Sequence, residues 1–284
     1  SEMCIRDRTT GAQGAITSIQ DTNQGAFTQS VIEDLSNAGR NLLVFIHGFD
    51  NTFSDAITRA AFNREWMSAS GVPAADTTVV AFSWPSLGRI VDLPILQEDY
   101  LHDQTMARLS GVHLMTFFAN LEPILRAARA NRRRTFLLAH SMGNLALQSG
   151  VENWFLHANG NALLFDLAFL AAGDCAYDSF ERPNLTGLSG LDILARRVSI
   201  YFSRVDLVLQ LSAVVNLGAQ RLGQDGPRNR TDPTLFPPAE FEMVDATDFQ
   251  DYDFDFLSSH QYYRRSPTAR SRIARAMGGG IATV

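Results

Sequence analysis

The sequence predicts an α/β fold built on a mostly parallel sheet with helices on both faces. Short apolar runs rich in branched and aromatic residues alternate along the chain with longer segments whose apolar residues recur at helical spacing. The apolar runs are almost continuous, which is typical of strands that are buried on both faces. Strands and helices that alternate in this way indicate one sheet packed between two layers of helices.

We expect the first half of the chain to contain helix 26–38, strand 41–49, helix 51–70, strand 77–86 and a long helix 106–130. Gly39 ends the first helix, and Thr52 or Ser54 caps the second. Pro123 is expected to bend or split the long helix. Residues 89–104 have weak periodicity and are expected to form an excursion over one edge of the sheet.

The second half is expected to contain strand 135–140, helix 142–156, strands 163–172, 196–204 and 239–247, and a final helix 266–277. Pro267 falls in the first turn of that last helix, where proline is favoured. About two dozen residues separate the strands that begin at 163 and 196, which leaves room for a short helix. Residues 223–238 are rich in turn-forming residues and form the clearest predicted loop.

The composition is that of a globular protein with one domain. The chain has 284 residues, of which 45% are hydrophobic and 19% are charged. The first ten residues lack periodicity, and the letters MCIRDR resemble adapter read-through, so they are excluded from the fold prediction. We therefore expect residues 1–25 to be a leader that is partly non-native or disordered, followed by a single domain over residues 26–284.

Charge and cysteine content narrow the class of protein. A formal net charge of −6 gives no electrostatic reason to expect a nucleic-acid partner. Two cysteines cannot build a disulfide framework, and neither has the spacing of a metal site. No apolar stretch approaches the roughly 18–20 residues of a membrane span. We expect a soluble protein that is cytoplasmic, or exported if a natural leader is missing.

A serine stands where the buried strand 135–140 turns into a helix. The letters AHSMG place Ser141 between two small residues, Ala139 and Gly143, each two positions away. A nucleophile at such a turn is held in a strained backbone conformation that needs small neighbours. The turn exposes the hydroxyl and aims the backbone N–H of Met142 at an anion forming beside it. The alternative is a serine that only caps the helix.

An earlier strand end supplies a second feature of acyl-transfer sites. The strand 41–49 ends in His47-Gly48-Phe49, at the position where such a site needs a further oxyanion donor. Gly48 lets the backbone approach, and the N–H of Phe49 is the expected donor. His47 is either part of the pocket or a structural histidine whose ring nitrogens are both bonded.

With these features the chain resembles the α/β-hydrolase superfamily, and more closely the bacterial α/β-hydrolases of the family DUF900. The resemblance is strongest in LVFIHGFDNTF, VVAFSWPS, LLAHSMGN and SHQYY, and it runs from about residue 26 to 277. It implies an α/β-hydrolase fold with a minimal lid. The chain departs from this pattern near its N-terminus, where the first strands expected of the fold are short or absent.

The resemblance also implies a Ser-His-Asp triad, in the chain order serine, acid, histidine. Only His157 and His260 follow Ser141, and His157 falls on the helix after the turn, so His260 is the expected base. Asp206 and Asp174 each follow a strand between Ser141 and His260. The family pattern Y-x-S-x-x-D-x-x-L favours Asp206 as the acid, while Asp174 remains the alternative acid, a site-lining residue or a cap.

Four further residues are expected near the pocket. Asp50 either orients the oxyanion loop or is a plain turn residue. Trp84 follows a strand end and could line the pocket together with Phe49 and Tyr262. Aromatic residues at such positions are as often packing residues as recognition residues. His47 completes this group.

These expectations predict a serine esterase that needs neither a metal ion nor an organic cofactor. Its substrate would be a small-molecule or polymeric ester, and the short connection between strands 163–172 and 196–204 favours short or accessible acyl groups. A lipase, thioesterase or amidase with the same triad is the alternative enzyme. A binding scaffold that keeps the fold without turnover is the alternative class.

Overall fold

One parallel sheet organises the chain. The computed structural model describes residues 4–5, 21–49, 51–69, 77–87, 95–157, 159–181, 183, 185–249 and 251–278. Six strands form the sheet, and every neighbouring pair in it is parallel. In order across the sheet they are β4 (Thr77–Phe82), β3 (Asn41–Ile46), β5 (Thr135–His140), β6 (Leu167–Ala171), β7 (Val198–Phe202) and β8 (Phe241–Asp245). The predicted parallel sheet is confirmed.

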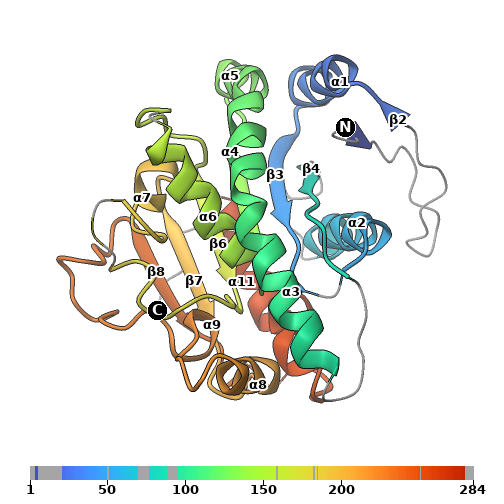
Figure 1. Ribbon diagram of the computed structural model, residues 1–284. Coiled ribbons are helices and arrows are strands. Elements are labelled where there is room, and N and C mark those ends of the chain that lie inside the picture. Colours follow the sequence, from blue (N-terminus) through green and yellow to red (C-terminus); the bar gives the residue numbers. More distant parts are fainter. Residues whose placement is uncertain are drawn as a thin grey trace.

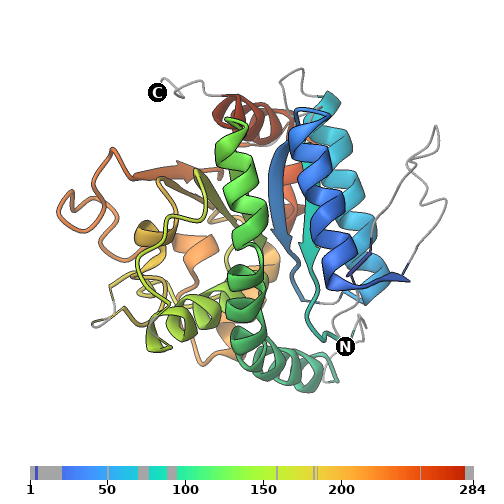
Figure 2. The ribbon, with the colours of Figure 1, turned by 90° about the horizontal axis from the view of Figure 1, so that it is seen from above.

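Helices cover both faces of this sheet, as the continuous apolar strands predicted. Val44 and Phe45 are neighbours in β3 and are both fully buried, yet they belong to two separate apolar clusters because successive side chains point to opposite faces. The first cluster packs against α1 (Gln24–Ser36), α4 (Gly111–Asn120), α5 (Glu122–Ala130) and α6 (Gly143–Leu156). The second packs against α2 (Phe53–Ala69) and α11 (Pro267–Met277). Figures 1 and 2 show the two layers.

The segment 89–104, expected to form an excursion over one edge of the sheet, is partly helical in the residues that the structure describes. Helix α3 (Ile95–Leu109) begins inside that segment. Its buried positions, Tyr100, Asp103 and Ala107, do follow helical spacing. Two of these three side chains carry a polar group, so a hydrophobic pattern could not reveal the helix.

The long helix predicted over residues 106–130 is three helices. α3 ends at Leu109, α4 follows, and α5 begins at Glu122 with Pro123 in its first turn. The split at Pro123 is therefore confirmed. Proline is tolerated there because the first N–H groups of a helix have no partner within it.

Two helices after β7 were not predicted. α8 (Leu207–Val215) has the sequence LVLQLSAVV, which is apolar almost all round and so has no helical period. α9 (Leu222–Asp225) occupies the start of the loop expected over residues 223–238. The described residues also contain the short helices α7 (Leu191–Leu194) and α10 (Tyr262–Arg265) and the 3₁₀ turn η2 (Ser258–His260).

The N-terminal segment does not extend the central sheet within the described residues. β1 (Cys4–Ile5) and β2 (Asp21–Thr22) pair with each other in a separate antiparallel ribbon. Most of the expected leader, residues 1–25, lies outside the described part of the chain. No helix among the described residues is long and apolar enough to cross a membrane.

The interior position of β5 yields a prediction about stability. Leu138 is fully buried in this strand, and its truncation in Leu138→Ala should lower the free energy of unfolding by about 2–5 kcal/mol because it leaves a cavity. Leu156→Ala, at the end of α6 where the side chain is 79% exposed, is the matched control and should change stability by less than about 0.5 kcal/mol. Urea unfolding measures both, and equal effects would contradict the placement of β5.

Candidate active site

Ser141 lies in the turn directly after β5, with a backbone conformation that is rare for a side chain other than glycine. Its φ is +56°, in the left-handed region, which costs about 1–3 kcal/mol. Three backbone bonds hold it there. The Ser141 N–H donates to the carbonyl of Ala171, and the Ser141 carbonyl accepts from the N–H groups of Asn144 and Asp174, each at 3.0 Å. The turn thus has the strained form that the sequence predicted for a nucleophile.

Two glycines let this turn pack against the end of β3. A Cβ on Gly143 would lie 2.4 Å from the carbonyl oxygen of His47, and a Cβ on Gly48 would lie 2.6 Å from the Cβ of Ser141. Neither contact is possible for real side chains, so both positions require glycine. The ends of β3 and β5, which pair directly in the sheet, therefore bring His47, Gly48 and Ser141 together.

His260 and Asp206 form a buried hydrogen-bonded pair. The His260 Nδ1 lies 2.8 Å from Oδ2 of Asp206, and the second carboxylate oxygen accepts from the N–H of Leu209 at 3.0 Å, which caps α8. A carboxylate only accepts, so Nδ1 carries the proton and the neutral ring keeps a lone pair on Nε2. This Nε2 is buried and has no hydrogen-bond partner among the described residues.

The same edge of the sheet holds His260 and the serine. The ring centroid of His260 lies 4.9 Å from that of His140, the residue directly before Ser141. Burial lowers the pKa of His260, but the charge of Asp206 and its hydrogen bond outweigh this effect and raise the pKa above its ordinary value. The ring can therefore accept a proton at Nε2 close to the serine turn.

Asp174, the alternative acid, has other partners. Its carboxylate accepts from Arg221 Nε at 2.8 Å, from the Tyr100 hydroxyl at 2.7 Å and from the Ser212 hydroxyl at 2.6 Å. None of the hydrogen bonds of this carboxylate within the described part of the chain comes from a histidine. Burial and the neighbouring Asp174 raise the pKa of Tyr100, which therefore stays protonated as a donor.

The predicted oxyanion donors are the N–H groups of Phe49 and Met142. Neither donates a hydrogen bond to an acceptor in the described residues. The carbonyl of Gly48 accepts from His47 Nδ1 at 2.9 Å and from Asn51 Nδ2 at 3.0 Å. Because a peptide C=O and the N–H of the next residue point in opposite directions in a trans peptide, these two donors fix the direction of the Phe49 N–H.

Sequence reasoning missed Asn51, Tyr100 and Arg221. Asn51 is buried and also donates to the carbonyl of Phe49 at 2.6 Å. A side-chain amide two residues beyond a turn reads from sequence as a simple turn residue, because asparagine favours turns. Tyr100 and Arg221 contact Asp174 from distant points in the chain, and no local sequence pattern predicts such contacts.

The structure brings His47 and Trp84 together beside the loop that follows β3. The two rings stack with centroids 5.1 Å apart. The backbone N–H of Trp84 donates to His47 Nε2 at 3.0 Å, and the Trp84 indole N–H donates to the carbonyl of His47 at 2.8 Å. Burial lowers the pKa of His47 to about 4, so the ring is neutral. Both ring nitrogens of His47 are bonded, as in a structural histidine.

The other expected pocket residues divide in two. Tyr262 is buried in the core, where its hydroxyl donates to the carbonyl of Tyr201 and accepts from the N–H of Ala172. Asp50 lies outside the described residues. No group of three or more histidine, cysteine, aspartate or glutamate side chains in the described ranges could hold a metal ion.

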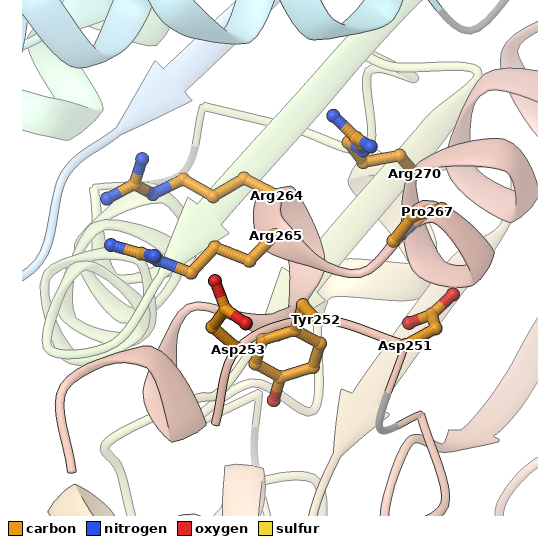
Figure 3. A pocket seen from close by; sticks show the side chains of 7 residues that line it. All are labelled: Asp251, Tyr252, Asp253, Arg264, Arg265, Pro267 and Arg270. Atoms are coloured by element: carbon orange, nitrogen blue, oxygen red, sulfur yellow. The ribbon is translucent and has the colours of Figure 1, made fainter. Parts of the chain in front are cut away.

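A surface pocket of about 540 Å³ lies on the segments that flank the His260 turn. Figure 3 shows its lining side chains, with those of Arg264 and Arg265 extending alongside each other. The pocket is lined by Asp251, Tyr252, Asp253, Arg264, Arg265, Pro267 and Arg270. It contains none of the residues expected to act at the serine, so the candidate active site is the sheet edge at Ser141.

Comparison with known proteins agrees with this geometry. Residues 23–276 match the family described as "Alpha/beta hydrolase of unknown function (DUF900)". No curated protein and no solved structure matches the chain.

The neutral state of His47 predicts a change in the pH dependence of stability. The folded-state pKa of about 4 lies below the ordinary value of 6.5, so the unfolded chain takes up the proton first. The contribution of neutral His47 is complete above pH 6.5 and is lost as the pH falls toward 4, by up to about 1.4 kcal/mol per pH unit. In His47→Gln the free energy of unfolding should be lower at pH 7.5, and it should fall less steeply between pH 6.5 and 4.

Urea unfolding at a series of pH values measures this slope. His113→Gln, which removes an exposed histidine on α4, should give a curve parallel to that of the wild type. A His47→Gln curve that is also parallel would contradict the neutral, bonded state of His47.

Proposed function

The chain belongs to the DUF900 family of α/β-hydrolases, and we propose that it is a serine hydrolase that cleaves carboxylic esters. The observation that carries this proposal is the buried hydrogen bond between His260 Nδ1 and Asp206 Oδ2, at 2.8 Å, which in the neutral ring leaves the lone pair of His260 Nε2 free beside the strained turn of Ser141. A serine hydroxyl is a weak nucleophile until such an oriented base accepts its proton.

In the first half of the reaction His260 Nε2 takes the proton of the Ser141 hydroxyl while Oγ attacks the ester carbonyl. The carbonyl oxygen becomes an anion, and the N–H groups of Phe49 and Met142 are the proposed donors to it. Asp206 stabilises the resulting imidazolium by charge and by its hydrogen bond to Nδ1. The bond to the alcohol oxygen then breaks, and His260 gives its proton to the leaving alcohol, which leaves an acyl ester on Ser141.

In the second half, water takes the place of the alcohol. His260 Nε2 removes a proton from the water, and the hydroxide oxygen attacks the acyl carbonyl under the same two backbone donors. The carbon–Oγ bond breaks, and His260 returns the proton to Ser141. The carboxylic acid leaves, and serine and histidine regain their starting states.

We propose short or accessible acyl esters as the substrates. Between β6 and β7 the described residues form only turns and the four-residue helix α7, so that connection adds no domain above the site. In the loop after β3, the ring centroid of Phe49 lies 5.8 Å from that of Tyr100. Hydrogen bonds to Asp174 and Ser212 hold this tyrosine in place, which restricts the space beside the oxyanion loop.

Substitutions at the serine and at the two aspartates test the triad. Ser141→Ala should abolish hydrolysis of p-nitrophenyl butyrate and labelling by a fluorophosphonate, because both need the activated hydroxyl. Asp206→Asn should lower kcat by roughly 10⁴-fold, since the amide favours the wrong tautomer of His260. Asp174→Asn is the matched control, and its kcat per labelled site should stay within about tenfold of the wild type.

Normalisation to labelled sites matters for this control. Asp174→Asn leaves the charge of Arg221 buried without a counter-charge, which destabilises the fold. A larger loss of kcat in Asp174→Asn than in Asp206→Asn would reverse the assignment of the acid. A folded wild type that neither hydrolyses esters nor reacts with the fluorophosphonate would favour a non-catalytic scaffold.

A series of p-nitrophenyl esters from acetate to palmitate tests the acyl preference. Because Tyr100 packs beside the oxyanion loop, we expect kcat/KM to be highest for acetate or butyrate and to fall at least about tenfold toward palmitate. Ser141→Ala run in parallel measures background hydrolysis. A maximum at the long chains would replace the esterase with a lipase.

A further inference from the structure

His140 joins the strand of the nucleophile to the turn of the base. It is the last residue of β5, it directly precedes Ser141, and it is buried. Its ring contacts two rings of the segment that carries the base, with centroid distances of 4.9 Å to His260 and 4.7 Å to Tyr263. The ring contact between His140 and His260 therefore links the base to the strand that carries the nucleophile.

A hydrogen bond adds to these ring contacts. His140 Nε2 lies 3.0 Å from the backbone carbonyl oxygen of His260. A carbonyl only accepts, so Nε2 carries the proton of His140 and its Nδ1 is bare. That Nδ1 is buried and has no partner in the described part of the chain. In the described residues, the His140 ring therefore interacts through the hydrogen bond of its Nε2–H and through its contacts with the two neighbouring rings.

The His260 turn has further attachments, but none of them reaches the serine directly. The Ser259 hydroxyl accepts from the N–H of Leu207, which is the first residue of α8 and directly follows Asp206. The Tyr262 hydroxyl bonds to Tyr201 in β7 and Ala172 after β6. These bonds set the position of the turn relative to β6 and β7. Its position relative to β5 depends on His140.

We infer that His140 is a positioning residue for the proposed ester hydrolysis, which fixes the backbone and ring of His260 relative to Ser141. His140 and Ser141 are consecutive residues. The hydrogen bond from the His140 side chain to the His260 backbone therefore joins the base to the residue directly before the nucleophile. The inference rests on the proposed function. A misplacement of about 1 Å at such a distance can cost about 100-fold in rate.

The charge state of His140 suits this role. Burial and the nearby His260 hold the pKa of His140 well below its usual range. His140 therefore remains a neutral donor when His260 takes up the proton of Ser141, and no second cation opposes that step. A positively charged ring in this place would disfavour the imidazolium of His260.

Two substitutions separate the hydrogen bond from the volume of the side chain. His140→Leu fills much of the space but has no donor, and we expect kcat per labelled site to fall about 10- to 100-fold with KM within about threefold of the wild type. His140→Gln can place an amide N–H near the position of Nε2, and it should recover most of the lost kcat. The substrate is p-nitrophenyl butyrate, and fluorophosphonate labelling counts the competent sites.

A purely structural role would give a different result. It would lower the melting temperature or the number of labelled sites and leave kcat per site unchanged. His157→Gln, an exposed position at the far end of α6, controls for the loss of a histidine and should match the wild type.

Equal kcat per site in wild type and His140→Leu would overturn this inference alone, as would a His140→Gln enzyme no better than His140→Leu. A folded wild type without labelling or hydrolysis would overturn the proposed function, and this inference with it.

Discussion

The strained backbone of Ser141 is the constraint on which the rest of the site depends. A serine at φ +56° persists only where its surroundings over-determine it. Here the carbonyl of Ala171, at the end of β6, and the N–H of Asp174, in the segment that follows, hold it, and the backbones at Gly48 and Gly143 leave no space in which the turn could relax. The parallel pairing of β3, β5 and β6 is therefore also the device that presents the hydroxyl.

Buried polar side chains at the same edge extend this constraint outward. Asp174 is fixed by Arg221, Tyr100 and Ser212, and its backbone holds Ser141. Buried charges are stable only when paired and hydrogen-bonded, so α3 and α8 must be in place before the Asp174 carboxylate can be buried. Folding of these two helices is thereby coupled to the geometry of the serine turn.

The sequence predicted what depends on neighbours in the chain and missed what depends on distant partners. The run TFLLAH coincides with β5 because its apolar residues alone define a strand buried on both faces. Ser141 and His260 could be proposed because the elbow and the chain order carry a signal. Helix α3 could not be predicted in full, because its buried face includes the polar residue Asp103. The hydrogen-bond partners of Asp103, Ser86 and Leu87, lie in another segment of the chain. Asn51 and Arg221 were missed for the same reason.

Three buried histidines, His47, His140 and His260, lie at this edge of the sheet. The group that accepts the hydrogen bond from each ring N–H determines whether the pKa of that histidine is lowered or raised. His47 and His140 donate to backbone carbonyls, of Gly48 and His260, which carry no full charge. Burial therefore prevails in both, and their pKa values fall. His260 donates to the carboxylate of Asp206, whose charge outweighs burial, and its pKa rises. The proposed base is thus distinguished from the other two histidines by one partner, the Asp206 carboxylate at the N-terminus of α8, more than fifty residues earlier in the chain.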